Sequence, residues 1–414
     1  MKNTRFPKFF LAVAGIVSLA TGSTLWAQMT PPPGTCEITS GEKSVRIPIK
    51  LIDTHVVLPA ELGGRTIGLI LDTGMPIHGV FLHAGSEADT YGLSFVGKAP
   101  VKGVGGGTVV SDLAMGVQIN LPGVVLKDQM AIVMPYAIDR HGAFSREGLH
   151  GVIGLSLFDR FVVHIDYDER VIVLQEPDSY SPPAEAEILP FTFRRNIPLL
   201  TCSAQMPGGS TATINLVLDS GSSQALTLNV GSQESIAIPS AAIETRIATG
   251  ATGDIEGHVG RIPWLKIGSH RFENVVASFK PRPETGSAAE GAEGVLGAGV
   301  LRRFKVTFDY GRKRLILRPG WSLSKPFECD MSGLDVSRRE DGRLAINRVV
   351  RASAAEEAGL GPQDIIEEVM GRPAGDVGLF EFREMMKTEG NKVTLVADRM
   401  GKKRTVTLTL RRQI

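Results

Sequence analysis

An internal repeat constrains the fold of this chain more strongly than any other feature of its sequence. The segment 151–174, GVIGLSLFDRFVVHIDYDERVIVL, returns without a gap at 294–317 as GVLGAGVLRRFKVTFDYGRKRLIL. Arginine, phenylalanine, aspartate and tyrosine stand at the same places in both copies. Self-similarity of this kind means that one structural unit has been used twice, so we expect two equivalent lobes in a single chain.

Two further pieces of the repeat lie upstream of these segments. An apolar run that ends in Asp72-Thr73-Gly74 matches another that ends in Asp219-Ser220-Gly221. A glycine-rich stretch follows each aspartate after 31 residues, at 103–107 in the first copy and at 250–253 in the second. The two lobes therefore share one plan over most of their length.

Short apolar or alternating runs between glycine and charged turns predict β-strands in both lobes. The 47 glycines in 414 residues exceed the usual share of about 7% and suit a chain with many turns. We therefore predict a mostly β fold class. The expected strands are 45–51, 67–71, 161–165 and 171–174 in the first lobe and 214–218, 305–308 and 314–317 in the second.

The predicted domain organisation follows the repeat. We place the first lobe at 40–175 and the second at 188–320. Between them, 176–187 contains three prolines and little apolar surface, which is typical of a linker. The repeat no longer continues at 326–414, and we expect that segment to form a separate unit.

Residues 1–27 have the three-part pattern of a secretory signal peptide. Three basic residues precede an apolar run at 9–20, and small residues follow up to Ala27, where we expect cleavage. The alternative is a membrane anchor, but a dozen apolar residues are fewer than the roughly 20 needed to span a bilayer. We therefore predict an exported protein, periplasmic or extracellular after cleavage.

The composition and spacing of polar residues do not favour nucleic acid, a metal or a cofactor. Lysine plus arginine (45) nearly equals aspartate plus glutamate (44), whereas a nucleic-acid-binding protein carries a strongly basic face. The histidines, His78 and His83 among them, lack the spacing of a zinc site. Three cysteines allow one disulfide at most, and the sequence leaves its pairing open. We expect no metal and no cofactor.

The two Asp-Thr/Ser-Gly triplets are candidate catalytic turns. Aspartate and glycine are also the ordinary residues of turns at strand ends, so one triplet alone is weak evidence. Two triplets at equivalent points of a duplicated lobe would face each other and bring the carboxylates of Asp72 and Asp219 together. Such a pair shares a proton, and it can activate a water and protonate a carbonyl. Because it titrates as a unit, we assign no separate acid and base.

The chain resembles the aspartic proteases, more closely the retropepsin-like branch than the large pepsins. The resemblance rests on these two triplets and on the later Val152-Ile153-Gly154 and Val295-Leu296-Gly297. The resemblance implies a two-lobed acid-protease β-barrel fold. It also implies that Asp72 and Asp219 are the catalytic dyad of an endopeptidase. Residues that would support the dyad are Thr73, Gly74, Ser220, Gly221 and Ser222.

The glycine-rich stretch of the first lobe resembles a retropepsin flap, which closes over an extended peptide. The flap residues would be Gly103, Val104, Gly105, Gly106 and Gly107. The stretch at 250–253 would be a second flap. Since both lobes are in one chain, no dimer is needed and we expect a monomer.

One position departs from the family pattern. A small or hydroxyl residue usually follows the glycine of each triplet and hydrogen-bonds the dyad, and Ser222 fits this pattern in the second lobe. Met75 and Pro76 occupy the equivalent place in the first. Loss of that hydrogen bond should raise the pKa of Asp72. The alternative function is therefore a catalytically degenerate peptide-binding or scaffold protein of the envelope.

The segment 326–414 resembles a PDZ domain, an α+β module that adds a peptide as a strand. A capping box at Ser353–Glu356 predicts a short helix, and Asp376 is expected to open an amphipathic one. The peptide-binding loop would be Gly333, Leu334, Asp335 and Val336. A negative charge at Asp335 would repel a peptide carboxylate.

The resemblance implies that this module tethers or presents polypeptide substrates to the protease. The alternative is a packing domain that only steadies the two lobes.

Overall fold

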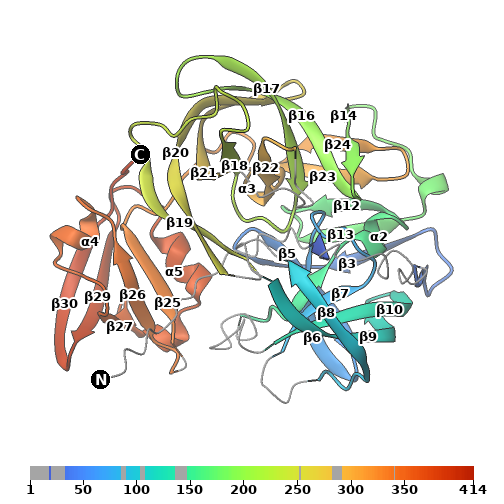
Figure 1. Ribbon diagram of the computed structural model, residues 1–414, viewed down its shortest axis with the longest axis horizontal. Coiled ribbons are helices and arrows are strands. Elements are labelled where there is room, and N and C mark those ends of the chain that lie inside the picture. The colour runs from blue at the N-terminus through green and yellow to red at the C-terminus, as the bar shows by residue number, and fades with distance from the viewer. Residues whose placement is uncertain are drawn as a thin grey trace.

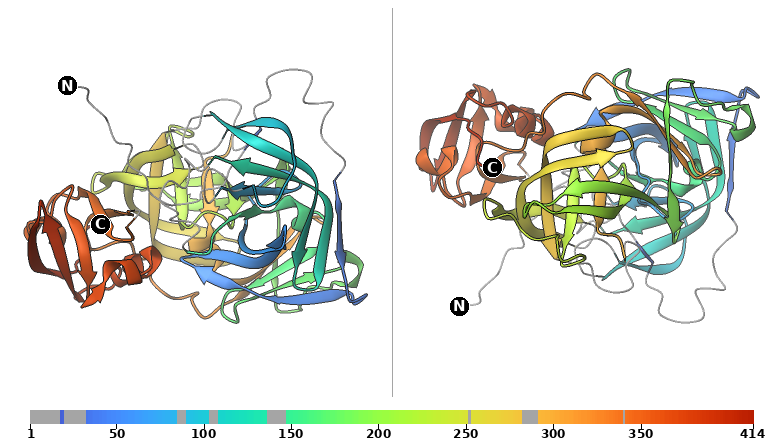
Figure 2. Two further views of the ribbon diagram at one scale, coloured as in Figure 1. Left: turned by 90° about the horizontal axis from the view of Figure 1, so that it is seen from below. Right: turned by 90° about the horizontal axis from the view of Figure 1, so that it is seen from above.

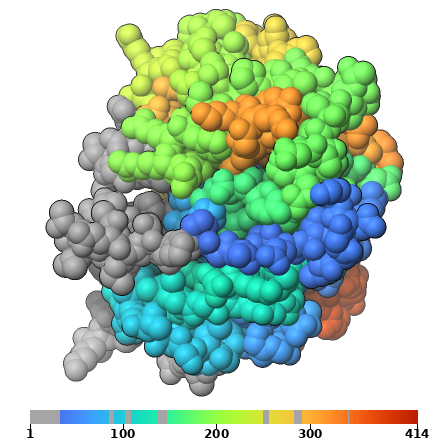
Figure 3. Space-filling view, turned by 90° about the vertical axis from the view of Figure 1, so that its right-hand side faces the viewer, coloured from blue at the N-terminus to red at the C-terminus, as the bar shows by residue number. Residues whose placement is uncertain are grey.

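The computed structural model describes residues 18–19, 33–84, 90–102, 108–135, 147–250, 253–281, 291–339 and 341–414. Two β lobes lie against each other, and a smaller C-terminal domain sits at one end of the pair (Figures 1 and 2). The opposite end is formed by the two lobes, with residues of the second above those of the first (Figure 3). The predicted mostly β fold class is confirmed. Of the expected signal peptide, the described part is 18–19 alone.

Among the described residues, a ten-stranded sheet forms most of the first lobe, in the order β1-β8-β9-β10-β7-β11-β6-β5-β4, with β2 beside β10. The strands are β1 (Ser18–Leu19), β2 (Thr35–Ile38), β4 (Lys50–Ile52), β5 (His55–Leu62), β6 (Arg65–Leu71), β7 (Val80–His83), β8 (Phe95–Lys102), β9 (Thr108–Leu121), β10 (Val124–Met134) and β11 (Gly151–Ile153).

The second lobe contains an eight-stranded sheet in its described part, in the order β15-β16-β17-β22-β18-β21-β20-β19. The strands are β15 (Thr192–Arg194), β16 (Ile197–Gln205), β17 (Thr211–Asp219), β18 (Leu226–Val230), β19 (Ile243–Gly250), β20 (Gly253–Ile267), β21 (His270–Pro281) and β22 (Gly294–Gly297). In each lobe the strand before the candidate catalytic turn pairs in parallel with a later short strand, β6 with β11 and β17 with β22.

A third sheet, with six strands among the described residues, joins the lobes in the order β14-β24-β23-β12-β13-β3. Its strands are β3 (Ser44–Pro48), β12 (Val162–Asp166), β13 (Val171–Gln175), β14 (Glu187–Pro190), β23 (Phe304–Asp309) and β24 (Arg314–Pro319). The two copies of the repeat pair with each other at its centre, where Val163 faces Phe308 and Ile165 faces Val306. This antiparallel pairing relates the lobes by a pseudo-twofold axis.

The single strand expected at 45–51 is wrong, because the chain forms two strands there. β3 pairs with β13 in the joining sheet, whereas β4 pairs with β5 in the first lobe. The chain therefore changes sheets after Pro48, and an apolar pattern does not reveal such a change. Short helices follow β11 and β22, and a helical turn lies in the linker: α2 (Leu155–Phe158), α3 (Ala298–Leu301) and η3 (Pro177–Ser179).

The C-terminal domain has its own sheet and its own core. Its elements are β25 (Leu334–Arg338), β26 (Leu344–Val349), α4 (Ala354–Glu357), β27 (Ile365–Val369), β28 (Arg372–Pro373), η4 (Ala374–Asp376), α5 (Leu379–Met385), β29 (Lys392–Arg399) and β30 (Lys402–Thr409). Ser353 caps α4 as expected, since its side chain accepts a hydrogen bond from the N–H of Glu356 at 3.2 Å. The buried apolar residues of this domain form a cluster separate from those of the lobes.

The expectation that Asp376 opens the second helix is wrong. Asp376 ends the turn η4, and α5 begins at Leu379. The carboxylate that receives the N–H of Leu379, at 2.9 Å, belongs to Glu147 of the first lobe. The N–H at the start of α5 thus finds its acceptor in another domain. For this reason the sequence around Leu379 does not indicate where the helix begins.

Arg303 fixes the connection between the second lobe and the C-terminal domain. Its guanidinium is 3.6 Å from the ring centre of Phe327 and donates to the carbonyl oxygens of Ser322 and Pro326 at 3.0 and 3.1 Å. Burial lowers the pKa of Arg303 to about 10, so it stays charged at neutral pH. The connecting segment is therefore held on the lobe by several bonds to one buried cation.

The three cysteines are free in the structure. Cys36 and Cys202 are buried, and burial raises the pKa of both thiols to about 12. They are therefore protonated core residues with little reactivity. No helix in the described ranges has the length and apolarity to cross a membrane.

Candidate active site

The two Asp-Thr/Ser-Gly turns meet at the interface of the lobes and brace each other. The N–H of Thr73 donates to Ser220 Oγ at 3.1 Å, and the N–H of Ser220 donates to Thr73 Oγ1 at 2.9 Å. Each hydroxyl then donates across the interface, from Thr73 to the carbonyl of Leu218 at 2.7 Å and from Ser220 to the carbonyl of Leu71 at 2.8 Å. These four buried bonds lock the two turns into one symmetrical unit.

The carboxyl groups of Asp72 and Asp219 face each other inside this unit. Their exposed fractions are 0% and 1%. Oδ1 of each accepts a hydrogen bond from the glycine two residues later, Gly74 at 2.6 Å and Gly221 at 2.9 Å. The Asp72 carboxyl packs so closely on the opposite turn that a Cβ atom at position 221 would lie 2.4 Å from Asp72 Cγ.

The proton affinities of the two carboxyl groups are raised to different extents. Burial and the neighbouring charge of Asp219 raise the pKa of Asp72 well above its ordinary value. Burial also raises the pKa of Asp219, but hydrogen bonds from Asp72 and Gly221 and the nearby charge of His55 oppose that rise. The pair therefore shares one proton over a wide pH range.

Met75 changes the surroundings of Asp72 less than the sequence suggests. The pKa of Asp72 is raised, as expected, but the main cause is burial of its carboxyl group. Met75 itself is 2% exposed and packs with Ile70 and with Phe380 of the C-terminal domain. On the other turn, the backbone N–H of Ser222 stabilises the Asp219 carboxylate.

Gly154, directly after β11, and Gly297, the last residue of β22, allow the chain to pass directly beneath the turns. A Cβ at Gly154 would lie 2.1 Å from the carbonyl oxygen of Asp72, and a Cβ at Gly297 would lie 2.2 Å from that of Gln224. Asp72 also donates its N–H to the carbonyl of Ile153 at 2.9 Å. The repeated glycine elements thus support the carboxylates from below.

The expected flap, 103–107, lies outside the described residues. The chain on either side of it forms the antiparallel hairpin β8–β9, with Lys102 paired to Thr108. At the equivalent place in the second lobe, Gly250 pairs with Gly253 at the end of the hairpin β19–β20. The edge of β8 also receives the short strand β1 in antiparallel register. An extended segment can therefore add to the sheet beside the first hairpin.

Two residues that lie at the candidate site, Tyr310 and His55, were not identified from the sequence. The hydroxyl of Tyr310 donates to the carbonyl of Thr73 at 3.4 Å, and its ring stacks on Phe158 with centroids 5.1 Å apart. The repeat includes Tyr310, because Tyr167 stands at the equivalent place, but repetition alone does not indicate a contact with the candidate catalytic turn. His55 is fully buried next to the Asp219 turn and belongs to no motif, so no signal in the sequence could have found it.

The expected peptide-binding loop of the C-terminal domain already uses its amides internally. The N–H of Gly333 donates to Oδ1 of the half-buried Asp330 at 2.8 Å, and that of Leu334 donates to Ser332 Oγ at 3.0 Å. Val336 lies in the domain core. Asp335 forms an ion pair with Arg246 of β19, which compensates the negative charge of the loop.

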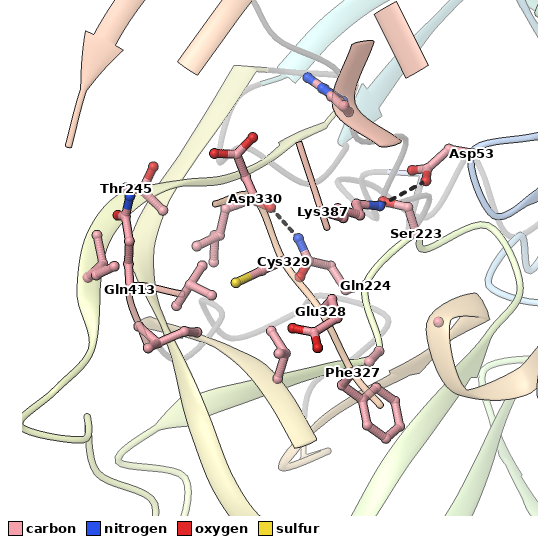
Figure 4. Close-up of a pocket in the computed structure, with 18 of the residues that line it drawn as sticks. Asp53, Ser223, Gln224, Thr245, Phe327, Glu328, Cys329, Asp330, Lys387 and Gln413 are labelled. Atoms are coloured by element: carbon pink, nitrogen blue, oxygen red, sulfur yellow. Dashed lines mark hydrogen bonds and ion pairs between the residues drawn. The ribbon is translucent and has the colours of Figure 1, made fainter. Parts of the chain in front are cut away.

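A cavity of about 340 Å³ is lined by this loop on one side and by the two lobes on the other. Figure 4 shows Asp53, Ser223 and Gln224 of the lobes around the same space as Asp330 and Lys387 of the C-terminal domain. Ser223 lies two residues beyond Gly221 of the second candidate catalytic turn. Leu334 and Asp335 of β25 and Arg383 of α5 also line this cavity, which therefore lies near the candidate active site.

Comparisons with known proteins agree with this geometry in the second lobe. A model of the family described as Aspartyl protease matches residues 204–300, a range that includes Asp219 and Gly297. The solved structure of the aspartic proteinase from Irpex lacteus is similar with a TM-score of 0.43 and 14% identity, over 68% of this chain and 99% of that chain. A search of curated proteins found no match. The sequence of the second lobe is thus similar to that of aspartyl proteases, which supports a peptide-bond hydrolase in general terms.

Proposed function

We propose that the protein is an aspartic endopeptidase in which Asp72 and Asp219 activate a water molecule against a peptide bond. The observation that carries this proposal is the pair of reciprocal hydrogen bonds between Thr73 and Ser220, which holds the turns of two buried carboxyl groups together. Such an arrangement is costly for stability, since like charges are buried together, and it is well suited to proton transfer.

The reaction needs one carboxylate and one carboxylic acid. The ionised member takes a proton from water while the water oxygen attacks the scissile carbonyl carbon. The protonated member gives its proton to the carbonyl oxygen, so a neutral tetrahedral diol forms. Collapse of the diol breaks the C–N bond: the proton held by the base passes to the leaving amine, and the other carboxylate takes a proton back from a diol hydroxyl. The dyad is then back in its starting state, and no redox step occurs.

The edge of β8 would hold the substrate as an extended strand. Ser18 and Leu19 pair there with Lys102 and Val101, which supports addition of a polypeptide strand at this edge. These two residues belong to the expected signal peptide, so cleavage after Ala27 would open the edge in the exported protein.

The test is cleavage of an unfolded polypeptide by the wild type and by the double variant Asp72→Asn/Asp219→Asn, from acid to neutral pH. We expect cleavage by the wild type and none by the variant. Asp112→Asn is the matched control and should retain activity, because this aspartate is 40% exposed and its ion pair within the described part of the chain is with Lys98, at 2.6 Å. Equal cleavage by all three would reject the dyad. No cleavage by the wild type at any pH would favour a scaffold protein.

We also propose that the PDZ-like domain presents internal segments of polypeptide substrates to the dyad. Its loop amides are satisfied by Asp330 and Ser332, which disfavours capture of a terminal carboxylate. The cavity that reaches Ser223 forms a groove lined on the side of this domain by Leu334 and Asp335 of β25 and Arg383 of α5. A strand held in that groove would lie near the catalytic turns.

The buried pair of Arg246 and Asp335 tests this role. Arg246→Glu places two negative charges together, and breaking a buried ion pair costs about 3–5 kcal/mol. We expect kcat/KM for an unfolded protein to fall at least about tenfold, with little change for a short peptide. The exchanged pair Arg246→Glu/Asp335→Arg should recover most of the loss. An equal fall for both substrates would instead indicate a domain that only steadies the lobes.

A further inference from the structure

We propose that His55 is a positioning residue which, as a cation, keeps Asp219 the ionised member of the dyad and leaves the proton on Asp72. The proposal rests on the function proposed above and assigns the roles of base and acid within it. His55 begins β5, and its side chain is completely buried beside the second catalytic turn. It does not touch the reacting atoms.

The hydrogen bonds of His55 show why its ring should be a cation. Nδ1 lies 3.2 Å from the carbonyl oxygen of Ile52, and Nε2 lies 3.1 Å from that of Gly221. Both partners can only accept hydrogen bonds, whereas a neutral imidazole has a single N–H to donate. A neutral ring would leave one buried nitrogen facing an oxygen with no hydrogen between them, at a substantial cost. A ring with hydrogens on both nitrogens satisfies both contacts.

The contact with Gly221 places this charge where it distinguishes the two carboxyl groups. Gly221 donates its N–H to Asp219 Oδ1 at 2.9 Å, so His55 holds the backbone that holds the carboxylate. The positive charge of His55 opposes the rise in the pKa of Asp219 that burial causes, and the N–H that His55 helps to hold donates to Asp219. Asp219 is therefore the general base toward water, and Asp72 is the acid toward the carbonyl oxygen.

Other charged groups around His55 do not remove this asymmetry. Asp53 lies in the same turn, and Lys387 of the C-terminal domain approaches it at 3.9 Å. Arg383 is buried on α5 and interacts electrostatically with Asp53. Lys280 of β21 interacts with Asp219, but burial lowers the pKa of this lysine and so disfavours its charged form.

The C-terminal domain completes the burial of His55. The ring of Phe380, on α5, meets the imidazole edge to face with centroids 6.5 Å apart. Phe380 is itself only 6% exposed. Water is thus kept from the histidine by a residue of another domain, and the hydrogen bonds to Ile52 and Gly221 remain its polar contacts.

The first test is the protonation of the ring, which can be measured without any activity. ¹⁵N NMR of the full-length wild type distinguishes rings with one and with two N–H groups. We expect two for His55 at neutral pH. His164 is the internal reference, because burial lowers its pKa to about 4 and its ring must be neutral under the same conditions. A neutral ring at His55 would overturn the proposal.

The second test is the pH dependence of catalysis in His55→Gln, which keeps one N–H donor but has no charge. Without the cation, the pKa of Asp219 should rise, so the acidic limb of kcat/KM should move to higher pH by about one unit. At a given pH on the acidic limb, kcat/KM of the variant should be about tenfold lower than that of the wild type, because a shift of one pKa unit corresponds to a tenfold change. His164→Gln should leave the profile in place.

An unchanged acidic limb in His55→Gln would overturn the proposal, even if the variant is less stable or has a lower kcat. Absence of cleavage by the wild type would reject the proposed function instead, and the NMR measurement would still decide the state of His55. The two failures are therefore distinguishable.

Discussion

Replacing Asp219 alone with asparagine should lower kcat/KM for peptide hydrolysis by about 10³-fold, within the usual range for loss of general acid–base catalysis. Asparagine keeps the shape of the side chain and can still accept the N–H of Gly221, which Asp219 receives at 2.9 Å. It cannot ionise and so cannot take a proton from water. The fold should remain, because the bracing bonds between Thr73 and Ser220 are untouched.

The single variant Asp72→Asn should lose about as much activity, and the double variant should lose little more. Two groups that act as one unit give strongly non-additive effects. The measurement is kcat/KM for one peptide over the full pH range, with circular dichroism to show that each variant is folded. Losses that simply multiply in the double variant would mean that the two carboxylates work independently, and the shared-proton mechanism would be wrong.

Gly221→Ala should lower kcat/KM by about 100-fold, because it displaces the opposite carboxyl group. The added Cβ would lie 2.4 Å from Asp72 Cγ and 2.6 Å from its Oδ2, far inside van der Waals contact. A displacement of about 1 Å at a catalytic group is enough for a loss of that size. Overpacking at a buried site should also lower the free energy of unfolding by about 1–3 kcal/mol, measured by urea denaturation.

Gly208→Ala is the matched control in the same lobe. A Cβ at Gly208 would have nothing within 4 Å, and its backbone is not in the left-handed region. Its stability should change by less than about 0.5 kcal/mol, and its activity should not change. If Gly221→Ala behaved like Gly208→Ala, the close approach of the two turns would not exist in solution.

Much of the candidate site was predictable because the duplication marks it twice. Asp72 and Asp219, with the hydroxyl residues after them, stand at equivalent points of two copies, and a twofold axis brings equivalent points face to face where they lie close to it. The glycines at 154 and 297 were visible for the same reason. In each case the prediction needed only a local sequence motif and the twofold relation between the two lobes, and no distance between atoms.

The residues that escaped prediction act through contacts between distant parts of the chain. His55 reaches the carbonyl of Gly221, 166 residues away. Glu147 caps the helix α5 at Leu379, 232 residues away, so the expectation for Asp376 was wrong. Neither histidine nor glutamate carries any mark of these partners in its own neighbourhood of sequence, because side-chain hydrogen bonds depend on position in space.

By itself, the sequence determined the mostly β class, the two equivalent lobes and the pairing of two aspartate turns, because a repeat and strand periodicity are local properties of the chain. Only the tertiary structure decided how the two carboxyl groups differ. Burial, the opposite charge and the His55 contact act on Asp72 and Asp219 unequally, although their sequences are nearly the same. A proton's position depends on the electrostatic surroundings of each oxygen, and those surroundings come from the whole folded chain, including the domain that carries Phe380.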